Sequence, residues 1–186
     1  METSELTESL SEIKSGNKVV AGPPHGSARS AARLGAVQAL YQLEATGTSD
    51  PESIGEVIEE FLVHRLGQEI DGDQYTAADR EYFVRLVRGT SSQLPEIDEA
   101  LSGALTSSWS LQRLDRILRC LLRAATCELM SMQDVPYRVV INEYLDVAHA
   151  FLSGDEPALV NGVLDRLARK FRDMPDRPDP QPDNSD

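Results

Sequence analysis

Aromatic residues are scarce in this chain, and long apolar runs are missing. Phe, Trp and Tyr make up 5% of the 186 residues. Leu, Ala, Glu and Arg, which are good helix formers, predominate instead. No apolar run approaches the roughly 18 residues of a membrane span, and the N-terminus lacks the basic, apolar and small-residue order of a signal peptide. The composition therefore predicts an all-α, cytoplasmic protein without a membrane partner.

Cysteine and histidine are too few and too scattered to suggest a disulfide or a metal site. Cys120 and Cys127 are seven residues apart on one predicted helix, which separates their Cα atoms by about 10 Å. A disulfide requires less than about 7 Å. None of the three histidines has a Cys or His partner at metal-ligand spacing. Glycine-rich phosphate loops and nucleophile motifs are also missing. We expect no metal, no cofactor and no enzymatic activity.

Acidic residues outnumber basic ones, but the two signs are segregated along the chain. A net charge of −13 at first argues against a nucleic-acid partner, because Lys and Arg drive phosphate binding. Residues 50–99, however, hold thirteen acidic residues and four arginines, a net of −9. The rest of 28–172 holds eleven basic and nine acidic residues, a net of +2. An acidic face on such a protein would repel RNA and so orient it toward a basic one.

Apolar periodicity and helix end signals divide the chain into two tails and one helical domain. Residues 1–27 and 173–186 are acidic and poor in apolar residues, so we expect both to be disordered. Between them we predict seven helices, at about 28–46, 51–66, 77–90, 94–105, 110–132, 136–152 and 157–171. Short loops favour an all-α bundle in two packed halves, 28–92 and 93–172.

Particular residues mark several of the predicted helix ends. Gly47 is expected to end the first helix, and Asp50 with Pro51 to open the second as N-cap and first helical residue. Thr76 with Asp79 resembles a capping box for the third.

The predicted helix 110–132 carries a stripe of arginines. Arg113, Arg116, Arg119 and Arg123 recur at spacings of three or four, which places them on one side of a helix. The opposite, buried side is formed by Ile117, Leu118, Leu121, Leu122, Ala125 and Leu129. Two interpretations stay open. The stripe is either a solvated face paired with neighbouring carboxylates or a track for RNA phosphates.

A second group of residues of the types that commonly contact RNA lies on the first predicted helix. Arg29 and Arg33 are four positions apart, and Tyr41 follows two turns later. Guanidinium groups bind phosphate, and tyrosine can stack on an unpaired base. Core packing is the alternative role for Tyr41.

Four segments resemble the bacterial NusB family of transcription antitermination factors. They are ARSAARLGAVQALYQLE, LQRLDRILRCLLRAATCEL, DVPYRVVINEYLDVAHAF and VNGVLDRLAR, in the family's order and spacing over about 28–170. The resemblance implies an all-α RNA-binding protein that binds boxA RNA of rRNA operons together with small-subunit ribosomal protein ten (NusE). It also implies assembly with RNA polymerase and other Nus factors, and suppression of termination.

The resemblance also suggests functional positions. Arg29, Arg33 and Tyr41 match the family's arginine-rich helix and its Ala-Leu-Tyr motif. Asp155 matches an acidic position at the family's partner and RNA surface. The predicted partner-binding pair is Asp155 and Glu156. The predicted RNA-binding set is Arg29, Arg33, Tyr41, Arg116, Arg119 and Arg123. Ser30 and Ala31 stand where relatives often have arginine, which predicts weaker intrinsic RNA affinity and more dependence on NusE.

Polar residues interrupt the two C-terminal helical patterns and allow two roles. Asn142 with Glu143, and Asn161 with Gly162, could contact RNA or NusE. We favour a packing role, in which Asn161 bonds to a neighbouring helix end and Gly162 lets two backbones approach closely. The same structural role is expected of Glu128. The alternative for the whole protein is a self-associating scaffold with no RNA binding of its own, in which a homodimer masks Arg29 and Arg33.

Overall fold

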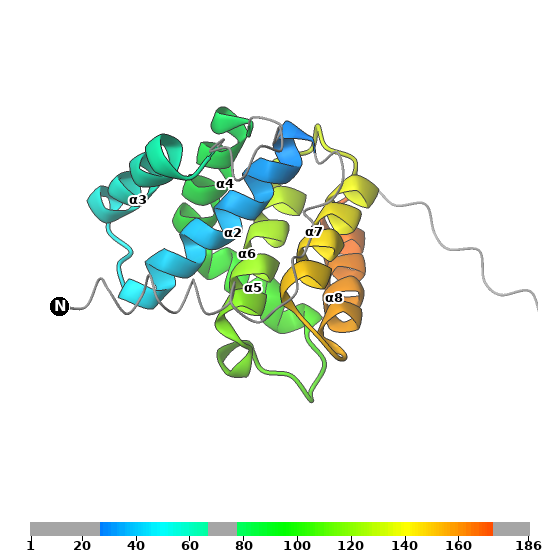
Figure 1. The fold of residues 1–186 in the computed structure, drawn as a ribbon. Coiled ribbons are helices and arrows are strands. Elements are labelled where there is room, and N and C mark those ends of the chain that lie inside the picture. Colours follow the sequence, from blue (N-terminus) through cyan, green and yellow to red (C-terminus); the bar gives the residue numbers. More distant parts are fainter. Residues whose placement is uncertain (1–26, 67–77, 173–186) are drawn as a thin grey trace, which may run out of the picture.

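The computed structural model describes residues 27–66 and 78–172, which form a purely helical bundle (Figure 1). The predicted tails, apart from Ser27, lie outside the described residues, as do Gly67 and Thr76. The helices are α2 (Ala28–Thr46), α3 (Pro51–His64), α4 (Arg80–Ser92), α5 (Leu94–Ala104), α6 (Arg116–Ser131), α7 (Tyr137–Phe151) and α8 (Glu156–Phe171), with a 3-10 turn η1 (Leu111–Arg113) before α6. The prediction of an all-α fold with about seven helices is confirmed.

Helix boundaries follow the end signals in the sequence. Gly47 ends α2 in the left-handed conformation at φ 68°, which glycine adopts without a Cβ clash. The Asp50 side chain accepts a hydrogen bond from the Ser53 amide at 2.9 Å, with Pro51 in the first turn of α3. Asp79 likewise caps α4 through the Tyr82 amide. The predicted end of the first helix at Gly47 and the predicted start of the second at Asp50 and Pro51 are confirmed. The predicted start of the third helix at about residue 77 is wrong, because Asp79 is the N-cap of α4 and not a residue of its first turn.

The predicted helix 110–132 is wrong at its start. Residues Leu111–Arg113 form the separate turn η1, and Leu114 is extended at ψ 146°. The α-helix begins only at Arg116, because the Asp115 side chain caps it by accepting a hydrogen bond from the Ile117 amide at 2.9 Å. Arg113 therefore stands outside the helical stripe formed by Arg116, Arg119 and Arg123.

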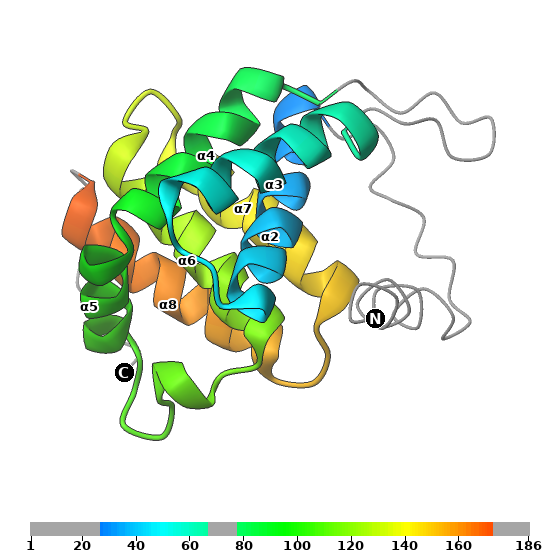
Figure 2. The same ribbon diagram turned by 90° about the vertical axis from the view of Figure 1, so that its left-hand side faces the viewer.

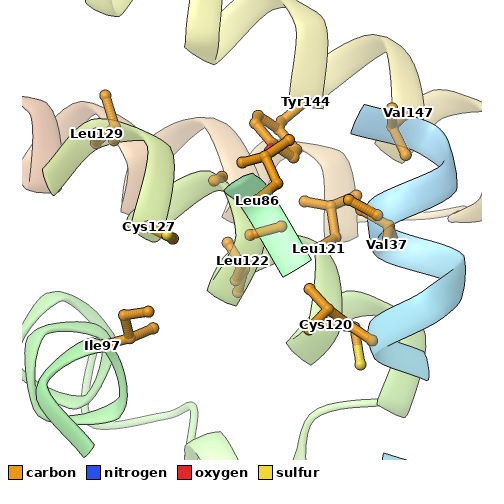
Figure 3. Packing of buried hydrophobic residues seen from close by; sticks show 14 of the residues in the cluster. Val37, Leu86, Ile97, Cys120, Leu121, Leu122, Cys127, Leu129, Tyr144 and Val147 are labelled. Carbon is orange, nitrogen blue, oxygen red and sulfur yellow. The ribbon is translucent and has the colours of Figure 1, made fainter. Parts of the chain in front are cut away.

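Helix α6 is the centre of the bundle, with α2, α4, α5, α7 and α8 packed against it. Its predicted buried face is confirmed, although Ile117 is only half-buried. Leu121, Leu122 and Leu129 contribute to a single apolar cluster that draws on every α-helix (Figure 3). Cys120 and Cys127 are buried in this cluster as free thiols. One core therefore joins both predicted halves, and the boundary between them near residue 92 stays a prediction.

Arg172 ties the end of α8 to the end of α6. Its guanidinium donates hydrogen bonds of 2.8–3.3 Å to the backbone carbonyls of Glu128, Leu129, Met132, Gln133 and Val135. The last turn of a helix leaves carbonyls without intrahelical partners. Arg172 supplies donors there and fixes α8 against the central helix. Helix α3 lies on the outside of the bundle, against α2 and α4 (Figure 2).

Candidate nucleic-acid interface

Tyr41 and Arg116 come together where the second half of α2 packs against the start of α6. The Arg116 guanidinium carbon lies 5.5 Å from the centre of the Tyr41 ring, a cation–π distance. Tyr41 is half-buried and Arg116 is exposed. Within the described residues, no carboxylate lies at ion-pair distance from Arg116. A cation beside an aromatic ring at the surface has the two chemistries that grip single-stranded RNA.

The other two arginines of the stripe are held by carboxylates. Glu44 of α2 accepts hydrogen bonds from both Arg119 and Arg123. Arg123 also makes a two-pronged contact with Asp98 of α5, with both distances 2.7 Å. Burial raises the pKa of the Glu44 carboxyl, but the hydrogen bond and charge of Arg119 outweigh it, so this pKa is lowered.

For Arg119 and Arg123, this network matches the first interpretation of the stripe, a face paired with neighbouring carboxylates. The Arg119 and Arg123 side chains are 16% and 15% exposed, and both are paired with carboxylates of neighbouring helices. That geometry is the carboxylate-paired face. Their predicted contact with RNA stays a prediction, and Arg116 is the stripe residue that the structure leaves most open to a phosphate.

Arg29 lies near the opposite end of α2 from Tyr41. Twelve residues separate the two, which is about 18 Å along a helix. The Arg29 side chain is 46% exposed and lies 3.7 Å from Asp79 and 4.0 Å from Asp134. Its guanidinium carbon is also 4.8 Å from the centre of the Tyr82 ring. The structure therefore does not bring Arg29 together with Tyr41 and Arg116.

The prediction that Arg33 belongs to a basic surface is wrong, because its side chain is 2% exposed. Arg33 makes a two-pronged contact with Glu128, which is 0% exposed, and also donates to Glu143 at 3.1 Å and to the Tyr82 hydroxyl. The Tyr82 hydroxyl in turn donates to Glu128 at 2.5 Å. Burial would lower the pKa of Arg33, but Glu128 outweighs that and raises it. Arg33 is buried within its own chain, so a homodimer is not needed to mask it.

The sequence did not predict most of the ion pairs of Arg33, Arg119 and Arg123, although it carried a signal for one of them. A glutamate and an arginine within otherwise apolar helical faces must find opposite charges when buried. Glu128 in the segment LRAATCEL fits that description, and its predicted structural role is confirmed. The partner residues Glu44 and Asp98 carried no such signal, since neither lies in a pattern that distinguishes it from a solvated carboxylate.

Asp155 ends the connection from α7 to α8, and Glu156 is the first residue of α8. Asp155 is exposed, with no side-chain cap bond to α8, and Glu156 accepts a bond from the Ser153 amide at 3.4 Å. Figures 1 and 2 place this connection at the same end of the bundle as the start of α6. The two predicted partner residues thus share an end of the molecule with Arg116, and their contact with a partner stays a prediction.

The packing role predicted for residues within the two C-terminal helices is wrong at Asn142, Asn161 and Gly162. Asn142 and Asn161 are exposed. A Cβ added to Gly162 would meet nothing within 4 Å among the described residues, so no close backbone approach requires glycine there. Glu143 is the exception, because it binds Arg33. Asn142 and Asn161 are instead available at the surface.

Within residues 27–66 and 78–172, no cluster of His, Cys, Asp and Glu has the arrangement of a metal site. No helix in this described part has the length and apolar character needed to cross a membrane.

The sequence model of the NusB family matches residues 30–169. The chain belongs to the NusB family. Among curated NusB relatives, the transcription antitermination protein NusB of Bartonella tribocorum is 48% identical over 150 residues, covering 81% of this chain and 94% of the relative. The same protein of Allorhizobium ampelinum is 49% identical over 144 residues, covering 77% and 88%.

Solved NusB structures have the same fold. T. maritima NusB is 32% identical, with a TM-score of 0.63, and the match covers 77% of this chain and 92% of that one. A crystal structure of antitermination factors NusB and NusE in complex with dsRNA contains a chain that is 25% identical, with a TM-score of 0.60 and coverage of 77% and 98%.

Proposed function

We propose that this protein is a transcription antitermination factor that binds boxA-type single-stranded RNA jointly with NusE. In this role it acts in the cytoplasm without catalysis, as part of the antitermination complex of RNA polymerase with other Nus factors. Membership of the NusB family supports the role. The observation in the structure that carries it is the exposed Arg116 beside the Tyr41 ring at the junction of α2 and α6.

The geometry favours a single strand over a duplex as the target. Tyrosine can stack only on a base that is not already stacked in a helix, whereas duplex RNA is recognised mainly by shape, phosphate and 2′-hydroxyl contacts. In the predicted RNA-binding set, Arg33 is buried and Arg119 and Arg123 are paired with carboxylates. The cations of that set left for phosphates are Arg116 and the partly exposed Arg29. Weak binding by the protein alone and tighter binding with NusE follow from this small set.

A fluorescence anisotropy titration of labelled boxA-type RNA tests the proposal. The RNA is titrated with the full chain alone, with NusE alone and with both. Unlabelled boxA single strand, boxA duplex and single-stranded RNA of shuffled sequence serve as competitors. We expect the mixture to bind about 5- to 150-fold more tightly than either protein alone, the range typical of coupled sites. We also expect the single strand to compete better than the duplex. If NusE binds the RNA equally tightly with and without this chain, the proposal is overturned.

A further inference from the structure

An exposed aromatic residue, followed four positions later by an arginine, lies between α5 and α6. Trp109, the single tryptophan of the chain, is 38% exposed. Arg113 follows four residues later in η1 and is also exposed. The large exposed hydrophobic side chains of the described residues include one other aromatic, Phe151, and it has no arginine within four positions. Of these two exposed aromatic side chains, Trp109 is the one with an arginine within four positions along the chain.

The segment is held in place on both sides of Arg113. Leu111 and Leu114 are buried in the core. Arg119 donates hydrogen bonds to their carbonyl oxygens at 3.2 and 2.9 Å, and Glu44 holds Arg119. These contacts make Arg119 a positioning residue for η1. A contact surface fixed in advance loses less conformational entropy when it binds.

The η1 segment continues the surface formed by Tyr41 and Arg116. Arg113 and Arg116 are three residues apart, so their Cα atoms are separated by at most about 11 Å. Figures 1 and 2 show η1 at the same end of the bundle as the start of α6. Residues 105–114 contain Arg113 and no acidic residue, and the carboxylate of Asp115, which follows, caps α6 by accepting a hydrogen bond from the Ile117 amide. The charge of this segment therefore suits a polyanion.

We propose that Trp109 and Arg113 form a second RNA-contact point, with Trp109 stacking on an unpaired base and Arg113 binding a neighbouring phosphate. This inference rests on the proposed function and extends its site beyond Tyr41 and Arg116. Trp109 and Arg113, both exposed and four positions apart along the chain, supply an aromatic ring and a guanidinium, the two groups with which proteins grip single strands. Arg119 serves this contact through the η1 backbone and not through a phosphate.

Trp109 fluorescence gives a direct test, because its signal comes from the contact point itself. The complex of the chain with NusE is titrated with boxA-type RNA while tryptophan emission and RNA anisotropy are both recorded, and the Trp109→Phe complex supplies the background. We expect Trp109 emission to fall in parallel with binding. Trp109→Ala should weaken binding about 5- to 150-fold, whereas Trp109→Phe, which keeps a ring, should lose much less.

The salt dependence of binding tests the arginine. Arg113→Ala should make the slope of log affinity against log salt shallower by about 0.7, the value for one phosphate contact to a single strand. Arg85→Ala, an exposed arginine on α4, is the matched control and should leave the slope unchanged.

Three outcomes would overturn the inference. RNA that binds without changing Trp109 emission means that Trp109 lies outside the RNA site, whatever the variants do. Emission that changes with NusE alone, and not further with RNA, assigns Trp109 to a protein contact. Failure of the wild-type complex to bind RNA at all, seen by anisotropy, removes the proposed function together with this extension.

Discussion

Replacing Arg33 with alanine should lower the free energy of unfolding by about 3–5 kcal/mol, the usual result of removing one partner from a buried ion pair. Glu128 is 0% exposed, and the Arg33 guanidinium compensates the negative charge of its carboxylate through hydrogen bonds of 2.6–3.2 Å. Without Arg33, the Tyr82 hydroxyl would remain as a donor to this carboxylate, but its charge would be uncompensated. Urea denaturation followed by circular dichroism measures the loss.

Two further variants serve as controls for Arg33→Ala. Arg29→Ala makes the same change one turn earlier on α2, where the side chain is 46% exposed and its acidic neighbours are 3.7 and 4.0 Å away, so the loss should stay below about 1 kcal/mol. Adding Glu128→Gln to Arg33→Ala removes the uncompensated charge and should recover part of the lost stability. If Arg29→Ala destabilises the protein as much as Arg33→Ala, the assignment of Arg33 to the core is wrong.

Removing the Tyr41 ring or the Arg116 guanidinium should weaken RNA binding while the fold is retained. Loss of a base–aromatic stack typically costs about 1–3 kcal/mol, so Tyr41→Ala should reduce affinity about 5- to 150-fold. Arg116→Ala should make the logarithmic salt slope shallower by about 0.7, the value for one phosphate contact. Anisotropy titrations with boxA-type RNA and NusE at several salt concentrations measure both effects.

Matched variants separate these contacts from general effects of charge and packing. Tyr41→Phe keeps the ring and should bind nearly as well as the wild type. Arg85→Ala removes the same charge from the exposed face of α4 and should leave the salt slope unchanged. Equal losses from Arg85→Ala and Arg116→Ala would mean that net charge, and not a contact at Arg116, governs binding.

Local signals in the sequence predicted the helices well, because their causes are local. Asp50 with Pro51 fixes the start of α3, and Gly47 fixes the end of α2, through contacts within a few residues. The start of α6 was misplaced because Ser110, where the predicted helix begins, and Asp115 are both of residue types that cap helices. The choice between them depends on Leu111 and Leu114 reaching the core and on Arg119 bonding to their carbonyls.

The candidate site was harder to predict, because exposure and pairing depend on distant segments. Arg29 and Arg33 are one turn apart on α2, so the sequence places them on the same side of the helix. Glu128, 95 positions away from Arg33, makes Arg33 a core residue, while Arg29 is exposed. In the same way, Glu44 and Asp98 decide that Arg119 and Arg123 are paired. Helical spacing identifies a shared face, but it does not reveal which other helix covers that face.

Photocrosslinking tests most directly where RNA lies on this protein. BoxA-type RNA carrying 4-thiouridine is bound to the full chain with NusE and irradiated, and the crosslinked peptides are identified by mass spectrometry. We expect crosslinks to the peptide that contains Tyr41 and to the segment 109–116. Crosslinks confined to α3 or α4, with none at Tyr41 or in 109–116, would contradict the placement of RNA at the junction of α2 and α6.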